Sequence, residues 1–471
     1  MRRDADSGKP STLIKNARLI DGLGSVHHDL QSIYIHEGKI AEIAQNIPVN
    51  NVRRLDVGGA TVMPGLIDAH VHLQSVPGSV FRRDSEEKLE KYRYHQLRAY
   101  LACGVTTILD NAIAASMLRK FQMHLSSGGI GPRLYALAPA FYTPNGFLDN
   151  DMLTSYWGPQ WRSAGSREDI EALFEEYEGI ENIIGVKTML ESGFGKSHLW
   201  PLHPPEIRKI IVSEAAKRNL PIYIHAFKKK EQEIGLDMGV HNFAHSGFIF
   251  GQPSNHFIDR MLKKGVYLTT TLSCTLDQML VQFEPARLHN DLIKLTVPEE
   301  LLMTAKNPEA WKDYYNTFIK NSSPKWMPSF FLKMIIKLIN IEKSIRTGLA
   351  NATKAVATMH KAGIPIVVGT DASNWPAFLT FFHGPSTIRE IELLGDGGIP
   401  PMDVILSATR IPSEMMGLQN LIGTVEVGKL ADLIVVRDDP LKDLSALRSV
   451  MWTIKDGEAR TPEEWMGYDH A

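Results

Sequence analysis

The pattern of hydrophobic and polar positions changes twice along the chain. In residues 12–63, short runs alternate between apolar and polar side chains and are separated by turn signals such as Asp21-Gly22, a pattern that predicts antiparallel β-strands. Residues 418–460 have the same character, with an apolar run at 433–436. Because the two ends of a domain often lie close together, we expect both segments to form one small β-sandwich domain.

Between these segments, short apolar runs alternate with longer helical patterns. The predicted strands are residues 66–73, 105–110, 134–138, 183–189, 222–226, 242–245, 266–271 and 366–371. Eight strands separated by helices predict an α/β fold, a (β/α)8 TIM-type barrel over residues 64–417. An open, doubly wound sheet is the alternative. No Gly-x-Gly-x-x-Gly follows the first strand, which argues against a dinucleotide site.

Residues 277–350 do not follow this repeat. They contain no clear strand pattern and many aromatic side chains: Phe283, Trp311, Tyr314, Tyr315, Phe318, Trp326, Phe330 and Phe331. An insertion of this size before the last strand predicts helices over the barrel mouth, where they would form a lid or a pocket wall. Extra core or an oligomer contact is the alternative.

Composition and charge exclude several classes of protein. The 471 residues are 44% hydrophobic and 22% charged, as in ordinary globular proteins. A net charge of −2 gives no reason to expect nucleic acid or an anionic membrane as partner. No apolar signal region and no run of about 18 apolar residues is present, so we expect a cytoplasmic protein. Cys103 and Cys274 lie in apolar runs, which predicts buried free thiols.

Side chains that bind metals follow several of the predicted strands. His70 and His72 end the first strand, and alternate residues of a strand point the same way. The other candidates at strand ends are Lys187, His225, His245 and Asp371. The carboxyl ends of barrel strands carry the functional side chains, and imidazole and carboxylate groups bind divalent metals. The set therefore predicts a metal site.

Residues of these types at strand ends also occur in proteins without any metal, in ordinary structural roles. A single strand-end histidine is commonly a hydrogen-bonded core residue, and a strand-end aspartate such as Asp371 is often a helix N-cap. A buried lysine such as Lys187 commonly extends to solvent. Their joint occurrence at successive strand ends favours the metal site.

The chain resembles the amidohydrolase superfamily from about residue 12 to residue 460. The resemblance is carried by residues 62–73, which contain His70-Val71-His72, and by the tail 423–435, which returns the chain to the small β domain. Residues 383–393 are similar to the imidazolonepropionase-like branch. That branch includes Xaa-Pro dipeptidases, ochratoxin-type amide hydrolases, and hydrolases of phenylurea and thiocarbamate herbicides.

The resemblance implies a ligand set: His70, His72 and Asp371 on one metal, His225 and His245 on a second, and a carboxylated Lys187 linking both. Two dications would repel an unmodified ammonium, whereas a carbamate is an anionic oxygen donor. Lys187 is therefore expected to be carboxylated or turned away. Zinc ranks first among the metals that these donors suit, before cobalt, manganese or iron, with one or two ions per chain.

Such a site predicts metal-dependent hydrolysis of an amide-like C–N bond: an amide, urea or carbamate. A metal lowers the pKa of bound water from about 15.7 to about 7 and polarises a carbonyl group. Asp371 can then take the proton of the attacking water and pass it to the leaving group. We place Asp371 and His245 among the catalytic residues.

Three other functions stay open. Deaminases of the superfamily commonly carry His-x-x-Glu on the fifth strand and lack the lysine, whereas this chain has His225-Ala226-Phe227-Lys228 and Lys187. A non-catalytic scaffold would have lost metal ligands, and every position is kept. An Xaa-Pro dipeptidase needs a group that binds the substrate carboxylate, for which the candidates are Arg82, Arg83, Lys196 and His383.

The loops after the strands predict a largely apolar pocket for a small substrate. The candidate contacts are Tyr142, Phe147, Phe194 and His383. Aromatic walls suit an aryl or alkyl amide, urea or carbamate. The alternative for the aromatic residues is that they pack loops together, and for His383 that it fixes a loop. The resemblance also implies a homo-oligomer.

Overall fold

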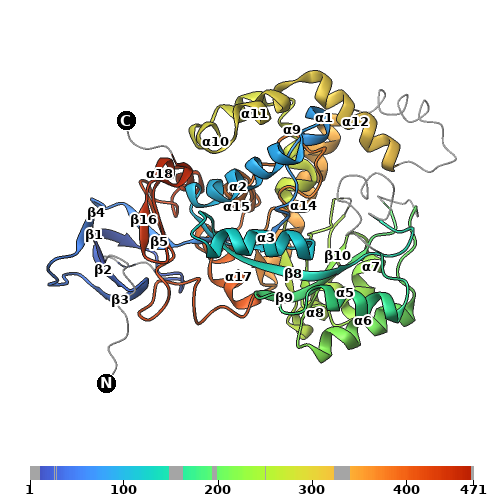
Figure 1. Cartoon of the computed structure of the whole chain (residues 1–471), viewed down its shortest axis with the longest axis horizontal. Coiled ribbons are helices and arrows are strands. Elements are labelled where there is room, and N and C mark those ends of the chain that lie inside the picture. Colours follow the sequence, from blue (N-terminus) through green and yellow to red (C-terminus); the bar gives the residue numbers. More distant parts are fainter. Residues whose placement is uncertain are drawn as a thin grey trace.

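The computed structural model describes residues 11–25, 27, 29–147, 163–193, 199–249, 251–322 and 340–467. Figure 1 shows an α/β barrel with a small sheet at one side. The barrel strands are β6 (Leu66–Val71), β7 (Val105–Asp110), β8 (Arg133–Phe141), β9 (Ile183–Leu190), β10 (Ile222–Ala226), β11 (Asn242–Phe243), β12 (Tyr267–Thr269) and β13 (Ile366–Val367). Each pairs in parallel with the next along the chain. The predicted TIM-type fold is therefore confirmed.

The barrel closes where β6 meets the segment that follows β13. The amide of Ala69 donates to the carbonyl of Val368 across 3.0 Å, and Val71 forms a parallel bridge with Ala372. Gly369 permits this approach, because a Cβ atom there would lie 2.7 Å from the Cβ of His70. The closure places the carboxyl ends of the first and last strands side by side.

A main helix follows each strand and covers the outside of the barrel. In strand order these are α2 (Glu86–Ala102), α3 (Ala115–Ser126), α5 (Arg167–Glu176), α6 (Pro205–Lys217), α7 (Lys229–Asp237), α8 (Asn255–Lys264), α14 (Ile341–Lys361) and α15 (Pro385–Asp396). Leu97 of α2, Ile211 of α6 and Val356 of α14 are fully buried in one hydrophobic cluster with the strands. This cluster is the main core, and burial of its apolar surface holds the strand ends in place.

Strands from both chain ends form the second sheet, as predicted. They are β1 (Thr12–Leu19), β2 (Gln31–His36), β3 (Lys39–Ala44), β4 (Arg53–Asp56), β5 (Thr61–Pro64), β14 (Leu433–Val436), β15 (Val450–Lys455) and β16 (Glu458–Arg460). The order is β16-β15-β14-β5-β1-β2-β3, with β4 beside β1. Strand β14 pairs antiparallel with β5 and with β15, so a segment from the C-terminal part lies inside the sheet.

The described part of segment 277–350 is helical. It comprises the end of η1 (Ser273–Asp277), α9 (Gln278–Leu280), η2 (Pro285–His289), α10 (Asp291–Thr296), α11 (Glu299–Lys306), α12 (Pro308–Ser322) and the first turns of α14. Tyr314 is buried, and its ring lies 6.1 Å from that of Trp375 and 5.9 Å from that of Phe378, in the loop after β13. Tyr314 thus packs the insertion onto the loop after β13, whereas Trp326, Phe330 and Phe331 lie outside the described residues.

The remaining helices are short: α1 (Ser79–Arg82), α16 (Pro401–Ser407), α17 (Arg410–Met415), η3 (Leu444–Arg448) and α18 (Pro462–Met466). Within the described ranges, no helix combines the length and the apolar character needed to cross a lipid bilayer. Cys103 and Cys274 are buried free thiols, as predicted.

Candidate metal centre

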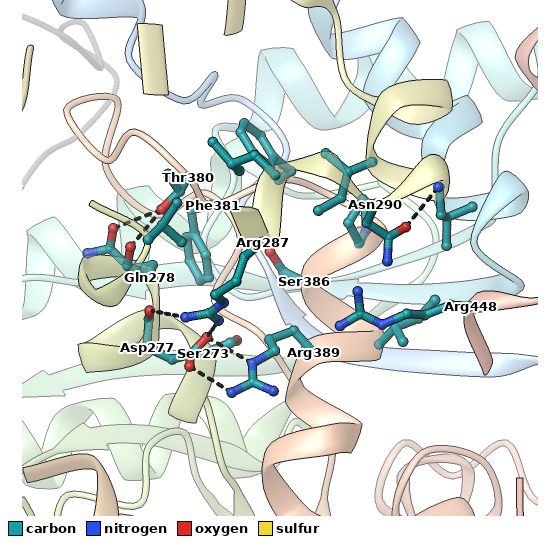
Figure 2. A pocket seen from close by; sticks show the side chains of 17 residues that line it. Ser273, Asp277, Gln278, Arg287, Asn290, Thr380, Phe381, Ser386, Arg389 and Arg448 are labelled. Carbon is teal, nitrogen blue, oxygen red and sulfur yellow. Dashed lines mark hydrogen bonds and ion pairs between the residues drawn. The ribbon is translucent and has the colours of Figure 1, made fainter. Parts of the chain in front are cut away.

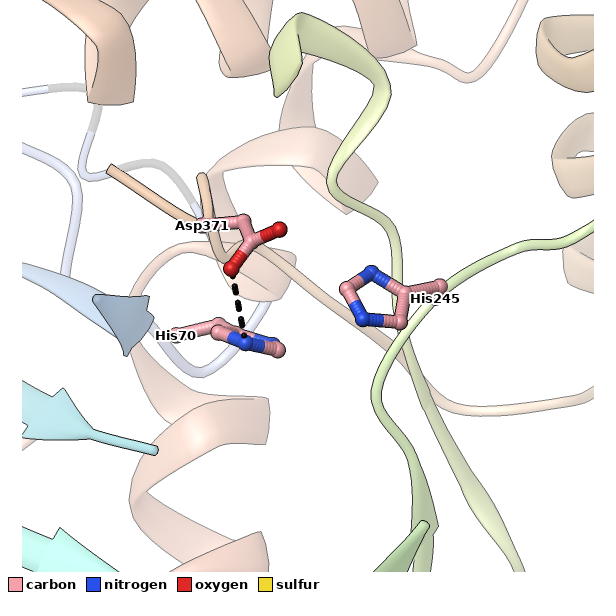
Figure 3. A group of neighbouring side chains, drawn as sticks. All are labelled: His70, His245 and Asp371. Atoms are coloured by element: carbon pink, nitrogen blue, oxygen red, sulfur yellow. Dashed lines mark ion pairs between the residues drawn. The ribbon is translucent and has the colours of Figure 1, made fainter. Parts of the chain in front are cut away.

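Three side chains from three distant parts of the sequence meet at the carboxyl ends of the barrel strands. His70 lies in β6, His245 follows β11, and Asp371 follows β13 (Figure 3). All three are buried, and they offer ligand atoms that lie within 4.8 Å of one another. Nε2 of His70 is 3.1 Å from Oδ1 of Asp371. Buried donors that converge in this way fit a cation.

His72 joins this group from the loop after β6. Its Nε2 lies 2.9 Å from Oδ1 of Asp371, the same oxygen that His70 approaches. Asp371 adopts a left-handed backbone with φ 66°, and its amide donates to the carbonyl of His70 across 2.6 Å. The local backbone thus directs the Asp371 carboxylate at both imidazoles.

Hydrogen bonds on the far side of each ring orient two of the histidines. Nδ1 of His70 lies 3.1 Å from the carbonyl oxygen of Ala244, and Nδ1 of His245 lies 2.8 Å from the hydroxyl of Thr271. The carbonyl of Ala244 can only accept, so Nδ1 of His70 carries the proton and Nε2 is free to bind a metal; the Thr271 hydroxyl holds the ring orientation of His245.

His225 extends the group along β10. Its ring centroid lies 4.5 Å from that of His245, and the residue is more than nine-tenths buried. Its Nε2 has no hydrogen-bond partner among the described residues. A buried polar atom without a partner requires an explanation such as a bound ion, so this atom fits a metal ligand.

Lys187 lies on β9 opposite Tyr223 of β10, and its side chain is buried in the barrel. Its Nζ donates to Oδ1 of Asn111 across 3.4 Å. Burial lowers the pKa of this amine from 10.5 to about 7, although the negative charge of Asp371 opposes the shift. A substantial neutral fraction therefore exists at neutral pH.

Burial also controls the protonation of the histidines. It lowers the pKa of His70 to about 3 and that of His245 well below 6.5, so both rings are neutral near pH 7. For Asp371, burial opposes ionisation, but the imidazoles of His70 and His72 beside Oδ1 hold the carboxyl pKa well below 3.8. Neutral imidazoles and an ionised carboxylate are the forms that bind a divalent metal.

The sequence profile of the amidohydrolase family matches residues 61–460 of this chain. The chain belongs to the amidohydrolase family. The resemblance inferred from the His-x-His stretch and the C-terminal tail is thus confirmed.

Individual relatives of this amidohydrolase are distant. A dihydroorotase of Syntrophotalea carbinolica is 24% identical over 472 residues, with 95% of this chain and 92% of the relative covered. The structure of an Xaa-Pro dipeptidase with bound methionine in its active site is 22% identical, with a TM-score of 0.70 over 96% of this chain and 100% of the other. Phenylurea hydrolase B is 17% identical, with a TM-score of 0.69 over 98% and 100% of the two chains.

The predicted substrate contacts of the amidohydrolase lie in different surroundings. Phe147 stacks on the ring of His225 at a centroid distance of 5.1 Å and also contacts Trp200 at 5.1 Å. Tyr142 is buried after β8 and pairs with Ser163 in an isolated β-bridge. Phe194 lies outside the described residues.

His383 lies behind the metal ligands. It is buried, with Nδ1 2.6 Å from Nε2 of Gln96, and its Nε2 accepts from the amide of Ser373 across 3.1 Å. Burial lowers the pKa of its imidazole to about 3. Because both ring nitrogens already face protein groups, the geometry is that of a residue that fixes the loop after β13. We therefore leave His383 out of the proposed substrate contacts.

Two residues beside the site were not selected from the sequence. Phe227 stacks on His245 with centroids 5.1 Å apart and planes 16° apart, and it lies two residues after His225, on the same side of the extended chain. Glu191 follows β9 with a fully buried side chain 3.6 Å from Nε2 of His225. The alternation of side chains along the strand could have placed Phe227 beside His225, but no local sequence pattern predicts that Glu191 lies at the site.

A cavity of about 110 Å³ lies elsewhere, between the insertion and α15 (Figure 2). It contains none of the predicted metal ligands, and part of its polar lining is paired within the cavity: Asp277 forms ion pairs with Arg287 and with Arg389. Helix η1 contributes Ser273 and Asp277 to this cavity and Cys274 to the metal centre. These ion pairs fix the end of η1.

Proposed function

We propose that this amidohydrolase is a metal-dependent hydrolase that cleaves an amide-like C–N bond, in an amide, urea or carbamate, within a small and largely apolar substrate. The convergence of His70, His245 and Asp371 carries the proposal. Neutral imidazoles beside an ionised carboxylate suit zinc, with cobalt, manganese or iron as alternatives.

The ligand assignment distributes the side chains over two positions: His70, His72 and Asp371 at the first, His225 and His245 at the second, and a carboxylated Lys187 between them. The buried amine of Lys187, with its pKa near 7, supports the bridge because only the neutral amine reacts with carbon dioxide. Nε2 of His225, which has no hydrogen-bond partner among the described residues, supports the second position.

When bound, the metal supplies Lewis-acid polarisation of the substrate carbonyl and a water of lowered pKa. Asp371 accepts the proton of the attacking water on its carboxylate and delivers it to the leaving nitrogen. Oδ2 of Asp371 accepts a hydrogen bond from the side-chain amide (Nδ2) of Asn374 at 2.5 Å, while Oδ1 faces His70 and His72. The carboxylate is thereby fixed at the point where it transfers the proton.

The surroundings favour an apolar, uncharged substrate. Phe147 and Phe227 cover the rings of His225 and His245. Arg82, a candidate for binding a dipeptide carboxylate, already donates to Asp84, to the carbonyl of Pro77 and to Thr304. This pairing supports a small neutral substrate over an Xaa-Pro dipeptide, which is the second candidate because of the shared fold.

The first test is metal content per chain of the purified protein, combined with hydrolysis assays on aryl ureas, thiocarbamates, aryl amides and Xaa-Pro dipeptides. About two metals per chain with turnover of one substrate class is the expected result. About one metal with turnover would retain the hydrolase and remove the bridging role of Lys187. No metal, and no turnover after zinc, cobalt or manganese is added, would refute the proposal and favour the scaffold. Release of ammonia from an amino-substituted ring would favour the deaminase.

A further inference from the structure

Glu191 carries a buried carboxylate at the end of β9, next to the proposed second metal position. Its Oε1 accepts a hydrogen bond from the amide of Gly193 at 2.7 Å. Its Oε2 has no hydrogen-bond partner in the described part of the chain. This oxygen lies 3.6 Å from Nε2 of His225, which also lacks a partner there. Two buried polar atoms without partners thus face each other.

The distance between the two atoms is too long for a hydrogen bond. A buried carboxylate oxygen without a compensating interaction is costly, and so is an unpaired imidazole nitrogen. A cation between Oε2 and Nε2 satisfies both. Ligand atoms about 2.0–2.1 Å from a tetrahedral zinc ion lie about 3.3 Å from each other, so the observed 3.6 Å needs little adjustment.

The loop around Glu191 is held by a different carboxylate. Oε1 of Glu231 accepts hydrogen bonds from the amide and hydroxyl of Ser192, at 3.0 and 2.6 Å, and its Oε2 accepts from the amide of Lys228. Glu231 therefore fixes the loop to α7. Glu191 uses only Oε1 for the loop, which leaves Oε2 directed at His225.

We propose that Oε2 of Glu191 is a ligand of the cation that His225 binds, and so completes the second metal position with an anionic donor. This inference rests on the proposed function. The second position holds a dication beside the first, and the imidazole ligands His225 and His245 supply no negative charge to it. A carboxylate at Glu191 balances part of this positive charge. The second ion is then bound by His225, His245, Glu191 and the Lys187 bridge.

The test is the replacement Glu191→Gln, with Zn²⁺ or Co²⁺ alone as the probe. Glutamine retains an oxygen that accepts from the Gly193 amide, but removes the negative charge at Oε2. Metal content is measured by elemental analysis, and affinity by competition with a chelator. Wild type is expected to hold two ions. E191Q is expected to keep the first ion and to bind the second about 10–100-fold more weakly.

Two variants separate direct ligation from loop positioning. Glu231→Gln alters the carboxylate that fixes the same loop and is expected to keep two ions at wild-type affinity. His225→Ala is expected to weaken binding of the same second ion. The double variant with Glu191→Gln should bind that ion only slightly more weakly than His225→Ala alone. If E191Q does not fold, Glu191→Asp is used instead: it retains the negative charge, but its shorter side chain moves the carboxylate oxygen away from His225. It should weaken the second Co²⁺ and change its visible absorption.

Wild-type affinity for both ions in E191Q would overturn the inference and leave the proposed function intact. Equal losses of the second ion in E191Q and E231Q, with no change in the visible absorption of Co²⁺ in Glu191→Asp, would also overturn it, because Glu191 would then act through the loop. Two tightly bound ions in E191Q with impaired turnover would make Glu191 a substrate contact instead of a ligand. Absence of metal from wild type would overturn the inference and the proposed function together.

Discussion

The thiol of Cys274 donates a hydrogen bond to Oδ2 of Asp371 across 3.3 Å. Burial raises the thiol pKa well above 9.0, so the thiol stays protonated and remains a donor. The side-chain Nδ2 of Asn374 donates to the same oxygen at 2.5 Å. One carboxylate oxygen is thus held from helix η1 and from the loop after β13, while the other faces the histidines.

We expect Cys274→Ala to lower metal affinity about tenfold, because loss of a hydrogen bond to a ligand costs roughly 10–100-fold. Cys274→Ser keeps a donor and should stay close to wild type. Competition with a chelator measures the difference, and Cys103→Ala, at a buried thiol away from the site, is the control. Unchanged affinity in Cys274→Ala would show that Asn374 alone orients Asp371.

Replacement of Asp371 should abolish most turnover. In Asp371→Asn the carboxylate that transfers the proton is lost, and we expect kcat to fall by about 10²–10⁴. His70→Ala, His72→Ala, His225→Ala and His245→Ala should cut turnover by orders of magnitude. Thermal unfolding should show that each variant is folded. Asp396→Asn, at an exposed carboxylate, should be unaffected. Turnover within tenfold of wild type in Asp371→Asn would remove its role in proton transfer.

Lys187→Ala should lose metal, since no carbamate can form. Acetate or propionate, added at high concentration, should partly restore metal content and turnover by occupying the space of the missing group. Metal analysis before and after addition measures the effect, and Lys229→Ala on the exposed side of α7 is the control. Full metal content in Lys187→Ala without added carboxylate would contradict the bridging role.

Stability should depend on pH through Glu390, which accepts hydrogen bonds from the amides of Leu272 and Ser273 at 2.8 and 2.7 Å. Burial raises its carboxyl pKa from 4.5 to about 7. Between these values the folded state keeps a proton that the unfolded chain has lost, so the free energy of unfolding falls as pH rises through this window. A shift of this size corresponds to about 3 kcal/mol.

Denaturant unfolding of wild type and Glu390→Gln, at several pH values from 4.5 to 7 and with chelator present, tests this dependence. The stability of wild type relative to the variant should decline by about 3 kcal/mol across the range, because glutamine does not titrate. A constant difference between the two proteins would show that Glu390 has an ordinary pKa.

The sequence predicted the barrel well where apolar runs are bounded by turn residues. Strands β7 and β10 begin and end where the pattern placed them. The prediction was too long at the last strand, which ends at Val367 instead of residue 371. The strand ends early because of the candidate metal site. Gly369 lies close to His70, and Asp371 has a left-handed backbone, so the chain leaves the strand ladder after Val367. Strand propensity does not capture either constraint.

The candidate site was predictable only for residues at strand ends. His70, His225 and the other predicted ligands lie at or just after the carboxyl ends of barrel strands, where functional side chains of this fold are found. Glu191 is a loop residue in the sequence, and such a glutamate is ordinarily solvated. Only the tertiary structure shows that its carboxylate is buried opposite His225. His383 illustrates the converse: its place in the chain suggested a substrate contact, whereas in the structure both of its ring nitrogens face protein groups, which favours the loop-fixing alternative.

The place of β14 within the small sheet has a consequence for biosynthesis. Leu433 pairs with Pro64, so one edge of β5 stays unpaired until the ribosome has made the whole barrel and reached β14. Exposed edges of this kind pair with other chains. A chain whose translation stops between α17 and residue 433 contains every candidate metal ligand but leaves this edge of the sheet open. Pairing of β14 with β5 therefore covers this edge only after the barrel has been synthesised.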